Sequence, residues 1–310
     1  MNSFYGIIFK NVRRHYMTKV RKAVIPAAGY GTGFFPATKA SSKELLPIVD
    51  KPIIQFIVEE AFDSGIEEVL IITGKQKRSI EDHFDSNYEL EQNLAENGKD
   101  ALLNIVKSTT REGLYFVRQS YPLGLGDAIL HAKAFVANEP FAVLLGDNIT
   151  EGNIPVTKQL IDLYEEHQSA CLAVVEMENT PEKKYGFVQK ESSEVSDEKV
   201  FSVKSFVEKP SKADQPSNLV IAGRYILTPD IFEVLESLKP GVDEEIQLTD
   251  AINQLSQANK VLAKVIEGER FDVGDKLGYL EYSLQYGLRH PETSQDLKKY
   301  LIELVKQLKQ

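Results

Sequence analysis

The residues with the most evident chemistry lie in one stretch, residues 22–52. A short apolar run there is followed by three glycines at alternate positions and then by two lysines: Gly29, Gly31, Gly33, Lys39 and Lys43. A loop of small residues after a buried strand lets backbone N–H groups approach a phosphate closely, and nearby lysines add positive charge to that contact. The stretch therefore predicts a phosphate-binding loop around which the rest of the chain is arranged.

Three known loop patterns compete for this stretch. A dinucleotide-binding fingerprint requires a third glycine at the position of Phe34. A Walker loop requires glycine and then lysine where Phe34 and Phe35 stand. A plain glycine turn without a ligand fits an isolated Gly-x-Gly equally well, because glycine mainly signals a permissive backbone. The second half of the stretch, Lys43–Ile48 and Asp50–Pro52, sets it apart from such a turn.

Two aspartates that are far apart in the sequence are candidates for a second part of the site. Asp147 follows Gly146 at the end of an apolar run, and Asp272 lies in the segment Phe271–Asp275. Each aspartate alone is more often a turn residue or a helix cap. Mg²⁺ prefers a few carboxylates together with phosphate and water oxygens. Beside a phosphate-binding loop, the pair predicts a shared magnesium site, whereas Asp275 is better suited to capping the helix that follows it.

Taken in order, the motifs resemble those of the nucleotidyltransferases that join a sugar 1-phosphate to a nucleoside triphosphate. The resemblance is strongest to the bacterial UTP–glucose-1-phosphate uridylyltransferases. The family signature is a Gly-x-Gly-Thr-Arg loop followed by Pro-Ala-Thr-Lys, Pro-Lys-Glu and Leu-Pro. This chain matches the signature at Gly29–Thr32, Pro36–Lys39, Lys43–Glu44 and Leu46–Pro47.

The chain departs from the family pattern at a few positions. Ser42 replaces a proline, which is a mild change, and Gly33 replaces the arginine of the loop. The resemblance implies that this arginine holds the outgoing phosphates of the triphosphate. A charge-assisted hydrogen bond contributes roughly 1.5–3 kcal/mol, so its loss is expected to lower rate or affinity about ten- to a hundredfold. Asp127 stands where related uridylyltransferases carry histidine, and Glu245–Asp250 matches a family motif whose role is left open.

The resemblance also assigns roles to individual positions. It places the nucleotide on Ala27, Ala28, Gly29, Gly31, Thr32, Lys43, Glu44, Gln119 and Gly124. It places the sugar phosphate on Gly186, Glu208, Lys209 and Gly223. It makes Asp147 and Asp272 the ligands of a Mg²⁺ cofactor, and it makes Lys43, Asp147, Lys209 and Asp272 the catalytic residues.

Some of these roles have a chemical reason in the side chains. The amide of Gln119 can present a donor and an acceptor to the edge of uracil, and Gly124 gives backbone access to the same base. Lys209 supplies a cation and Glu208 supplies a hydroxyl acceptor, and a sugar phosphate needs both. Without the family context, the last pair would be no more than a charged strand end.

Composition narrows the class of protein. The net charge of −10 implies no basic face and argues against a general nucleic-acid binder. The single cysteine, Cys171, permits no intrachain disulfide and lies in an apolar run, which fits a core thiol in a cytoplasmic protein. No apolar run approaches the roughly 20 residues that span a bilayer, so we expect no membrane association.

The elements that must position these residues follow from the apolar pattern. Up to residue 150, short continuous apolar runs alternate with helical stretches, which is typical of a parallel sheet covered on both faces. Ligands bind beyond the carboxyl ends of such strands, where the glycine loop and Asp147 both fall. We also expect a helix over 53–64, one charge-rich helical stretch over 79–106, and a hairpin built from 187–189 and 201–206.

These expectations combine into an α/β, Rossmann-like nucleotidyltransferase fold with a mixed, mostly parallel central sheet and a small β-rich sugar-binding part. Residues 20–290 are predicted to form one domain, with a nucleotide half at 20–150 and a sugar half at 151–290. Residues 1–16 are interpreted as a disordered arm or a mis-assigned start. Residues 291–310 are predicted to form a helix that either packs on its own chain or contacts a second copy in a homodimer or homotetramer.

The predicted activity is the transfer of a uridylyl group. UTP and glucose 1-phosphate would give UDP-glucose and pyrophosphate by Mg²⁺-dependent, in-line attack on the α-phosphorus. A first alternative is a weakly active or inactive regulatory paralogue, which Gly33 motivates. A second alternative is a nucleotidyltransferase for another hexose 1-phosphate or for dTTP. A dinucleotide-binding oxidoreductase is the most distant alternative.

Overall fold

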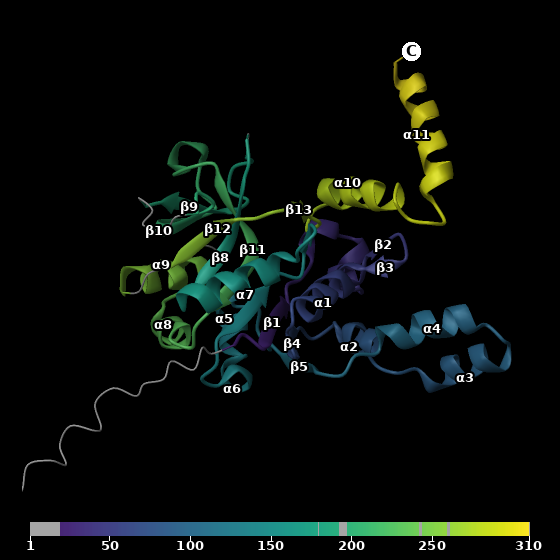
Figure 1. Ribbon diagram of the computed structural model, residues 1–310, viewed down its shortest axis with the longest axis horizontal. Coiled ribbons are helices and arrows are strands. Elements are labelled where there is room, and N and C mark those ends of the chain that lie inside the picture. Colours follow the sequence, from purple (N-terminus) through teal and green to yellow (C-terminus); the bar gives the residue numbers. More distant parts are fainter. Residues whose placement is uncertain (1–18, 179, 192–196, 242–243, 259–260, 310) are drawn as a thin grey trace, which may run out of the picture.

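The computed structural model describes residues 19–178, 180–191, 197–241, 244–258 and 261–309 (Figure 1). The interpretation of residues 1–16 falls outside this part of the chain. Within it, one sheet of nine strands runs through both predicted halves of the molecule. The division into a nucleotide half and a sugar half remains a prediction.

The central sheet has the strand order β5-β4-β1-β6-β11-β8-β12-β10-β9. Its strands are β1 Lys22–Ala27, β4 Glu68–Thr73, β5 Leu114–Arg118, β6 Phe141–Leu144, β8 Cys171–Glu176, β9 Gly186–Lys190, β10 Val200–Glu208, β11 Leu219–Leu227 and β12 Leu262–Val265. The strands β5, β4, β1 and β6 are mutually parallel, as the apolar runs predicted. The sheet becomes mixed at β11, which is antiparallel to both β6 and β8.

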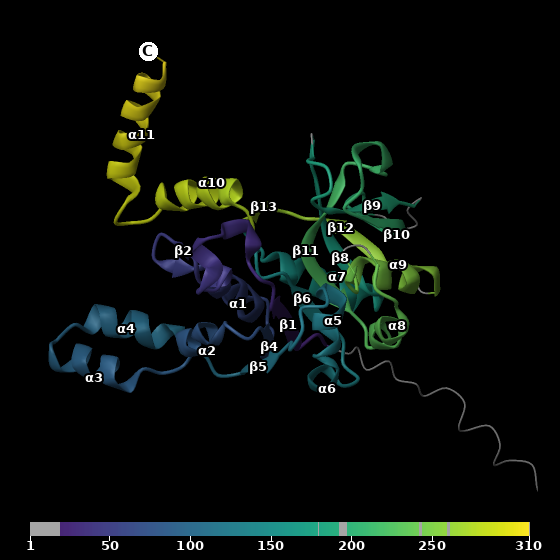
Figure 2. The same cartoon turned by 180° about the vertical axis from the view of Figure 1, so that it is seen from behind.

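Helices cover both faces of this sheet (Figures 1 and 2). They are α1 Ile53–Asp63, α2 Arg78–Phe84, α3 Tyr88–Glu96, α4 Asp100–Thr109, α5 Leu125–Leu130, α6 Lys133–Val136, α7 Val156–His167, α8 Ile231–Ser237, α9 Leu248–Ala258, α10 Lys276–Gly287 and α11 Ser294–Leu308. Successive side chains of β1 point to opposite faces. Ala23 and Ile25 therefore pack with α1 and α7, whereas Val24 packs with α5, α8 and α9.

The prediction of one helical stretch over 79–106 is wrong in its continuity, because the segment forms three helices. The side chain of Asn87 accepts a hydrogen bond from the backbone N–H of Leu90, which starts α3 anew after α2. Gly98 has a φ of 65°, a left-handed conformation that suits glycine, and it separates α3 from α4. The pair α3 and α4 extends away from the sheet as an arm (Figure 1).

Two small ribbons complete the elements around the loops. β7 (Asn148–Glu151) pairs with β13 (Glu269–Asp272) antiparallel, and this register sets Asp272 opposite Asn148. β2 (Pro47–Ile48) pairs with β3 (Lys51–Pro52), immediately after the stretch that holds the glycines. The predicted hairpin is present as the antiparallel pair β9 and β10.

The C-terminal helix α11 projects from the body of the molecule (Figures 1 and 2). None of its residues is buried, and Tyr300, Ile302, Val305 and Leu308 are exposed. Contact with its own chain occurs in the first turn, where Leu297 approaches Gly287. The structure therefore does not show the alternative in which the whole helix packs on its own chain. Among the described helices, none combines the length and the apolar character that a membrane span requires.

Candidate active site

The glycine loop follows the carboxyl end of β1 and has a backbone that only glycine accommodates without strain. Gly31 has a φ of 68°, and a Cβ placed on it would lie 3.3 Å from the Cβ atoms of both Thr38 and Lys43. The hydroxyl of Thr38 donates to the carbonyl of Gly31 at 2.7 Å. The loop is therefore held against the segment that carries Lys43, with its backbone facing a cleft.

Lys43 and Asp147 meet at the carboxyl ends of the sheet strands, a contact that the sequence analysis did not predict. The Nζ of Lys43 lies 2.6 Å from Oδ2 of Asp147. Burial lowers the pKa of Lys43, but the charges of Asp147 and Glu44 more than offset this, so the pKa lies above its ordinary value. Burial raises the pKa of Asp147, whereas the positive charge and the hydrogen bond of Lys43 lower it, and the lowering effects together are larger. The pKa of Asp147 therefore lies below its ordinary value. Both groups are thus held in their charged forms at neutral pH.

Asp147 and Asp272 converge on the backbone of Gly274. The backbone N–H of Val273 donates to the carbonyl of Asp147 at 3.0 Å, which joins the two segments. A Cβ placed on Gly274 would lie 2.9 Å from Oδ2 of Asp147 and 3.1 Å from Oδ1 of Asp272. Two facing carboxylates of this kind fit Mg²⁺, which takes oxygen ligands and completes its shell with phosphate and water.

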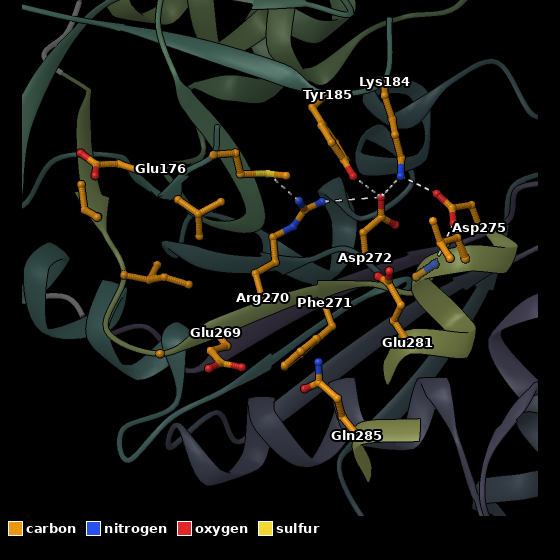
Figure 3. A pocket seen from close by; sticks show the side chains of 17 residues that line it. Glu176, Lys184, Tyr185, Glu269, Arg270, Phe271, Asp272, Asp275, Glu281 and Gln285 are labelled. Carbon is orange, nitrogen blue, oxygen red and sulfur yellow. Dashed lines mark hydrogen bonds and ion pairs between the residues drawn. The ribbon is translucent and has the colours of Figure 1, made fainter. Parts of the chain in front are cut away.

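Three further side chains surround Asp272, and the sequence interpretation had assigned a role to none of them. Figure 3 shows the Tyr185 hydroxyl and the Lys184 ammonium meeting its carboxylate, and the distances to Oδ2 are 2.8 Å and 2.9 Å. Arg270 lies 4.0 Å from the same oxygen. Burial lowers the pKa of Lys184, but its bonds to Asp272 and Asp275 outweigh this and raise the pKa above its ordinary value.

Arg270 connects the two carboxylates through the β7–β13 ribbon. Its Nε donates to Oδ1 of Asn148 at 2.7 Å, and the Asn148 amide donates to Oδ1 of Asp147 at 2.9 Å. The guanidinium of Arg270 therefore lies close to Asp272 and is linked to Asp147 through the side chain of Asn148. The neighbouring Asp275 accepts from the backbone N–H of Gly278 at 3.0 Å and so caps α10, as its position suggested.

Two neighbouring cavities meet at Asp147 and Gly274, and Asp272 lines the smaller of them. The larger has a volume of about 510 Å³ and the smaller about 300 Å³. Both are lined by Leu125, Leu145, Asp147 and Gly274. A reaction between two bound molecules requires adjoining sites, and the shared wall at Asp147 provides one.

The residues assigned to the nucleotide gather around the larger cavity. Those that line it are Ala28, Gly29, Gly31, Thr32, Lys43, Glu44, Gln119 and Gly124, and Lys209 lines it as well. Ala27 instead lies in the core at the end of β1, with 2% of its surface exposed. Glu44 is also buried, where its carboxylate accepts from Lys77 at 2.7 Å. Burial lowers the pKa of Lys77, although Glu44 opposes the shift.

Of the residues assigned to the sugar phosphate, Gly186 and Glu208 line the smaller cavity. The Thr249 hydroxyl donates to Oε2 of Glu208 at 2.6 Å, and burial raises the pKa of Glu208. Gly223 lines neither cavity. It has a φ of 75°, and a Cβ on it would lie 3.2 Å from the Cβ of Asn148, so its small size lets β11 approach the segment next to Asp147.

The segment 245–250, whose role the sequence left open, supports both cavities. Thr249 holds Glu208, as described, and a Cβ on Gly124 would lie 2.7 Å from the Cβ of Glu245. The backbone N–H of Ile246 donates to the carbonyl of Leu123 at 2.9 Å. The segment thus fixes the loop before α5 and the end of β10 relative to each other.

Comparisons with known proteins identify the family of this chain. The model of the nucleotidyl transferase family matches residues 22–287. A relative from Streptococcus pyogenes serotype M1, named UTP–glucose-1-phosphate uridylyltransferase 2, is 57% identical over 94% of this chain and 98% of its own length. A UTP–glucose-1-phosphate uridylyltransferase from Streptococcus pneumoniae serotype 4 is 55% identical with the same coverage.

Solved structures show the same fold. A UDP-glucose pyrophosphorylase complexed with UDP-glucose is 42% identical, has a TM-score of 0.80, and covers 87% of this chain and all of its own. A UTP-bound enzyme of the same type from Acinetobacter baumannii is 39% identical, has a TM-score of 0.83, and covers 92% of this chain and 99% of its own. The predicted α/β nucleotidyltransferase fold is confirmed. The chain therefore belongs to the nucleotidyl transferase family and, within it, to the UTP–glucose-1-phosphate uridylyltransferases.

Proposed function

We propose that this chain is a UTP–glucose-1-phosphate uridylyltransferase that makes UDP-glucose and pyrophosphate. The observation that carries the proposal is the convergence of Asp147 and Asp272 on Gly274, which lies in the wall that the two cavities share. The relatives at 55–57% identity are named for this reaction, and solved relatives hold UDP-glucose or UTP. Family membership removes the support for a dinucleotide-binding oxidoreductase.

The proposed reaction is one displacement at phosphorus without a covalent enzyme intermediate. A phosphate oxygen of glucose 1-phosphate forms a bond with the α-phosphorus of UTP. The bond from that phosphorus to the oxygen bridging the α- and β-phosphates breaks, and that oxygen leaves with the electron pair as part of pyrophosphate. Positioning and charge neutralisation are the contributions that such a reaction requires from the protein.

The chain supplies cations for both phosphorylated substrates. Lys43 and the backbone at Gly31 would hold the triphosphate, because both line the larger cavity. Lys209 would hold the attacking phosphate, because it lines the same cavity and follows Glu208, which lines the smaller one. Glu208 would accept hydrogen bonds from the sugar hydroxyls, with Thr249 fixing one of its oxygens.

We infer that Asp147 and Asp272 hold Mg²⁺. Bound there, the ion would neutralise phosphate charge as the α-phosphorus is attacked. In the structure, Lys43 already lies on the Asp147 carboxylate and Lys184 on the Asp272 carboxylate. Both carboxylates are therefore oriented and charge-balanced before any cation arrives.

We also infer a cytoplasmic homo-oligomer. The cytoplasmic assignment is supported by Cys171, which is the one cysteine of the sequence and is buried. A chain with a single cysteine forms no intrachain disulfide, the bond that an oxidising compartment favours. Support for self-association comes from the exposed apolar residues of α11, which a second copy of the chain could cover.

The test is pyrophosphate release by the purified protein with UTP, glucose 1-phosphate and Mg²⁺. Turnover that disappears with a chelator and returns with added Mg²⁺ supports the proposal. Tight UDP-glucose binding without turnover would favour the regulatory paralogue, which the glycine at position 33 keeps open. Faster turnover with dTTP or with another hexose 1-phosphate would instead identify a different member of the family.

A further inference from the structure

One wall of the larger cavity contains a glutamine, assigned to the base by the resemblance, whose amide orientation is fixed by its neighbours. Gln119 directly follows β5, and its Nε2 lies 2.6 Å from Oδ2 of Asp127 and 3.2 Å from the carbonyl oxygen of Gly124. A carboxylate and a carbonyl can only accept hydrogen bonds. The amino group of the Gln119 amide must therefore face them, since the flipped amide would set oxygen against oxygen.

This arrangement uses both N–H groups of the amide. One donates to Asp127 and the other donates to Gly124. Among the described residues, none donates to Oε1 of Gln119, and the residue lines both the larger cavity and a neighbouring cavity of about 210 Å³. Gln119 therefore offers a bound base an acceptor alone, not the donor and acceptor that an amide can present in general.

The position of Asp127 is itself set by the fold. It lies in the first turn of α5, and the N–H of Gly126 just before it donates to the carbonyl of Ile246 at 2.7 Å. A Cβ on Gly126 would lie 2.8 Å from that same carbonyl oxygen. The start of α5 is therefore held close against the backbone of Ile246, and the Asp127 carboxylate, with 15% of its side chain exposed, lies against Gln119.

We propose that Asp127 is a positioning residue that determines base specificity, an inference that rests on the proposed function. By holding the Gln119 amide in one orientation, it selects bases that present a ring N–H to the cavity. The N3–H of uracil and of thymine meets this requirement. The N3 of cytosine is an acceptor, and it would face the Gln119 oxygen with neither group satisfied, which is costly in a buried site.

The experiment compares kcat/KM for UTP, dTTP and CTP in the wild-type chain and in Asp127→Asn and Asp127→Ala. Asparagine keeps the shape of aspartate but can donate to the Gln119 oxygen. It therefore removes the shorter of the two contacts that orient the amide and leaves only the one to the Gly124 carbonyl at 3.2 Å. Asp100→Asn is the matched control, because Asp100 is an exposed aspartate in the first turn of another helix, α4. We expect the ratio of UTP to CTP efficiency to fall about tenfold or more in both Asp127 variants, while it stays unchanged in the control.

A combined variant with Gln119→Leu tests the route of the effect. If Asp127 acts through Gln119, the double variant with Asp127→Asn and Gln119→Leu has the same ratio of UTP to CTP efficiency as Gln119→Leu alone. Equal losses with UTP and CTP in the Asp127 variants would overturn the proposal, since a merely structural role lowers both alike. If the wild-type chain turns over no UTP, the proposed function fails separately. Calorimetric binding of UTP and CTP to the same variants then decides the specificity question.

Discussion

At the scale of single residues, Gly33 is the position where this chain differs most from its family signature. It lines the larger cavity, and a Cβ placed on it would lie 3.0 Å from the carbonyl oxygen of Gly274. Gly274 in turn lies between the carboxylates of Asp147 and Asp272. A side chain at position 33 would therefore reach the place where the phosphates are proposed to lie, after a shift of the backbone by a few tenths of an ångström.

We expect Gly33→Arg to raise the rate of pyrophosphate release about tenfold or more, since a guanidinium near the departing phosphates adds charge-assisted hydrogen bonds. Gly33→Ala is the control, because it introduces the same Cβ contact without the charge. The measurement is kcat with both substrates saturating. No gain from arginine over alanine would mean that glycine at this position is not a defect.

We expect Glu208 to be needed for sugar binding. We also expect its buried carboxylate to lower the free energy of unfolding of the chain. Burial raises its pKa in the folded chain. The folded state therefore binds more protons than the unfolded state between the ordinary and the raised pKa, so stability falls as the pH rises through that window. Glu208→Gln should melt at a higher temperature than wild type at pH 8, and the difference should vanish below the ordinary pKa of about 4.3. Thermal melts across pH check this, and a lower melting temperature at pH 8 would contradict it.

The same substitution should raise KM for glucose 1-phosphate about tenfold or more, because hydrogen bonds from hydroxyls to a carboxylate are charge-assisted. KM for UTP should change much less, since Glu208 lines only the smaller cavity of the two.

Asp147→Asn tests the proposed metal ligands. We expect the rate to fall about a hundredfold or more and the Mg²⁺ concentration for half-maximal rate to rise, because an amide is a weaker ligand for a hard cation than a carboxylate. Asp100→Asn is the control, since Asp100 is an exposed aspartate in the first turn of α4 and lines neither cavity. It should lose about 1 kcal/mol of stability at most and keep its Mg²⁺ dependence. An unchanged Mg²⁺ requirement in Asp147→Asn would rule that residue out as a ligand.

At the scale of elements, one buried ion pair joins the strands beneath the site. Arg224 on β11 is fully buried, and its NH2 group lies 2.6 Å from Oε2 of Glu60 on α1 and 2.7 Å from the carbonyl of Asn148 on β7. The Glu60 carboxylate also accepts from Thr150 and Thr157. Burial raises the pKa of Glu60, but Arg224 lowers it more, so the carboxyl stays ionised in the core.

Arg224→Met should destabilise the chain by about 3–5 kcal/mol, because it leaves the Glu60 charge buried without a partner. Lys158→Met removes one member of the exposed pair Lys158–Asp162 on α7. It should cost no more than about 1 kcal/mol. Urea denaturation of both variants measures the difference. Equal midpoints would show that the buried pair contributes nothing beyond an exposed one.

At the scale of the whole molecule, two arms extend from a body built on one sheet. The pair α3 and α4 forms one arm, and α11 forms the other (Figures 1 and 2). Helix α11 contributes no buried residue to its own chain, yet Tyr300, Ile302 and Leu308 are apolar and more than half exposed. Exposed apolar side chains that the described part of their own chain does not cover are better explained by association than by folding.

A chain that ends at Lys298 keeps Leu297 against Gly287 and removes the rest of α11. We expect the unfolding midpoint of this shortened chain, measured at low protein concentration, to change little. We expect its mass in solution to fall from that of an oligomer to that of a smaller species. Light scattering after gel filtration measures the mass. If the full-length chain is already monomeric, the proposed association through α11 is wrong.

Local features of this protein follow from its amino-acid pattern. Continuous apolar runs predicted the parallel strands, because a strand that is buried on both faces needs apolar side chains at every position. Small residues predicted the loop at Gly31, because a left-handed backbone favours glycine. The order of the motifs then predicted the family, which the comparisons confirmed. The helical stretch over 79–106 was right in type but wrong in continuity, because Asn87 and Gly98 interrupt it.

Contacts between residues that are distant in the sequence become visible in the folded chain alone. The approach of Asp147 to Asp272 depends on the pairing of β7 with β13, and no local pattern records that register. For the same reason, the sequence pattern could not predict the contact of Arg270 with Asp272 or that of Asp127 with Gln119. Periodicity and turn chemistry act between near neighbours in the chain, whereas a site of this kind is assembled by strand order and by packing across the whole sheet.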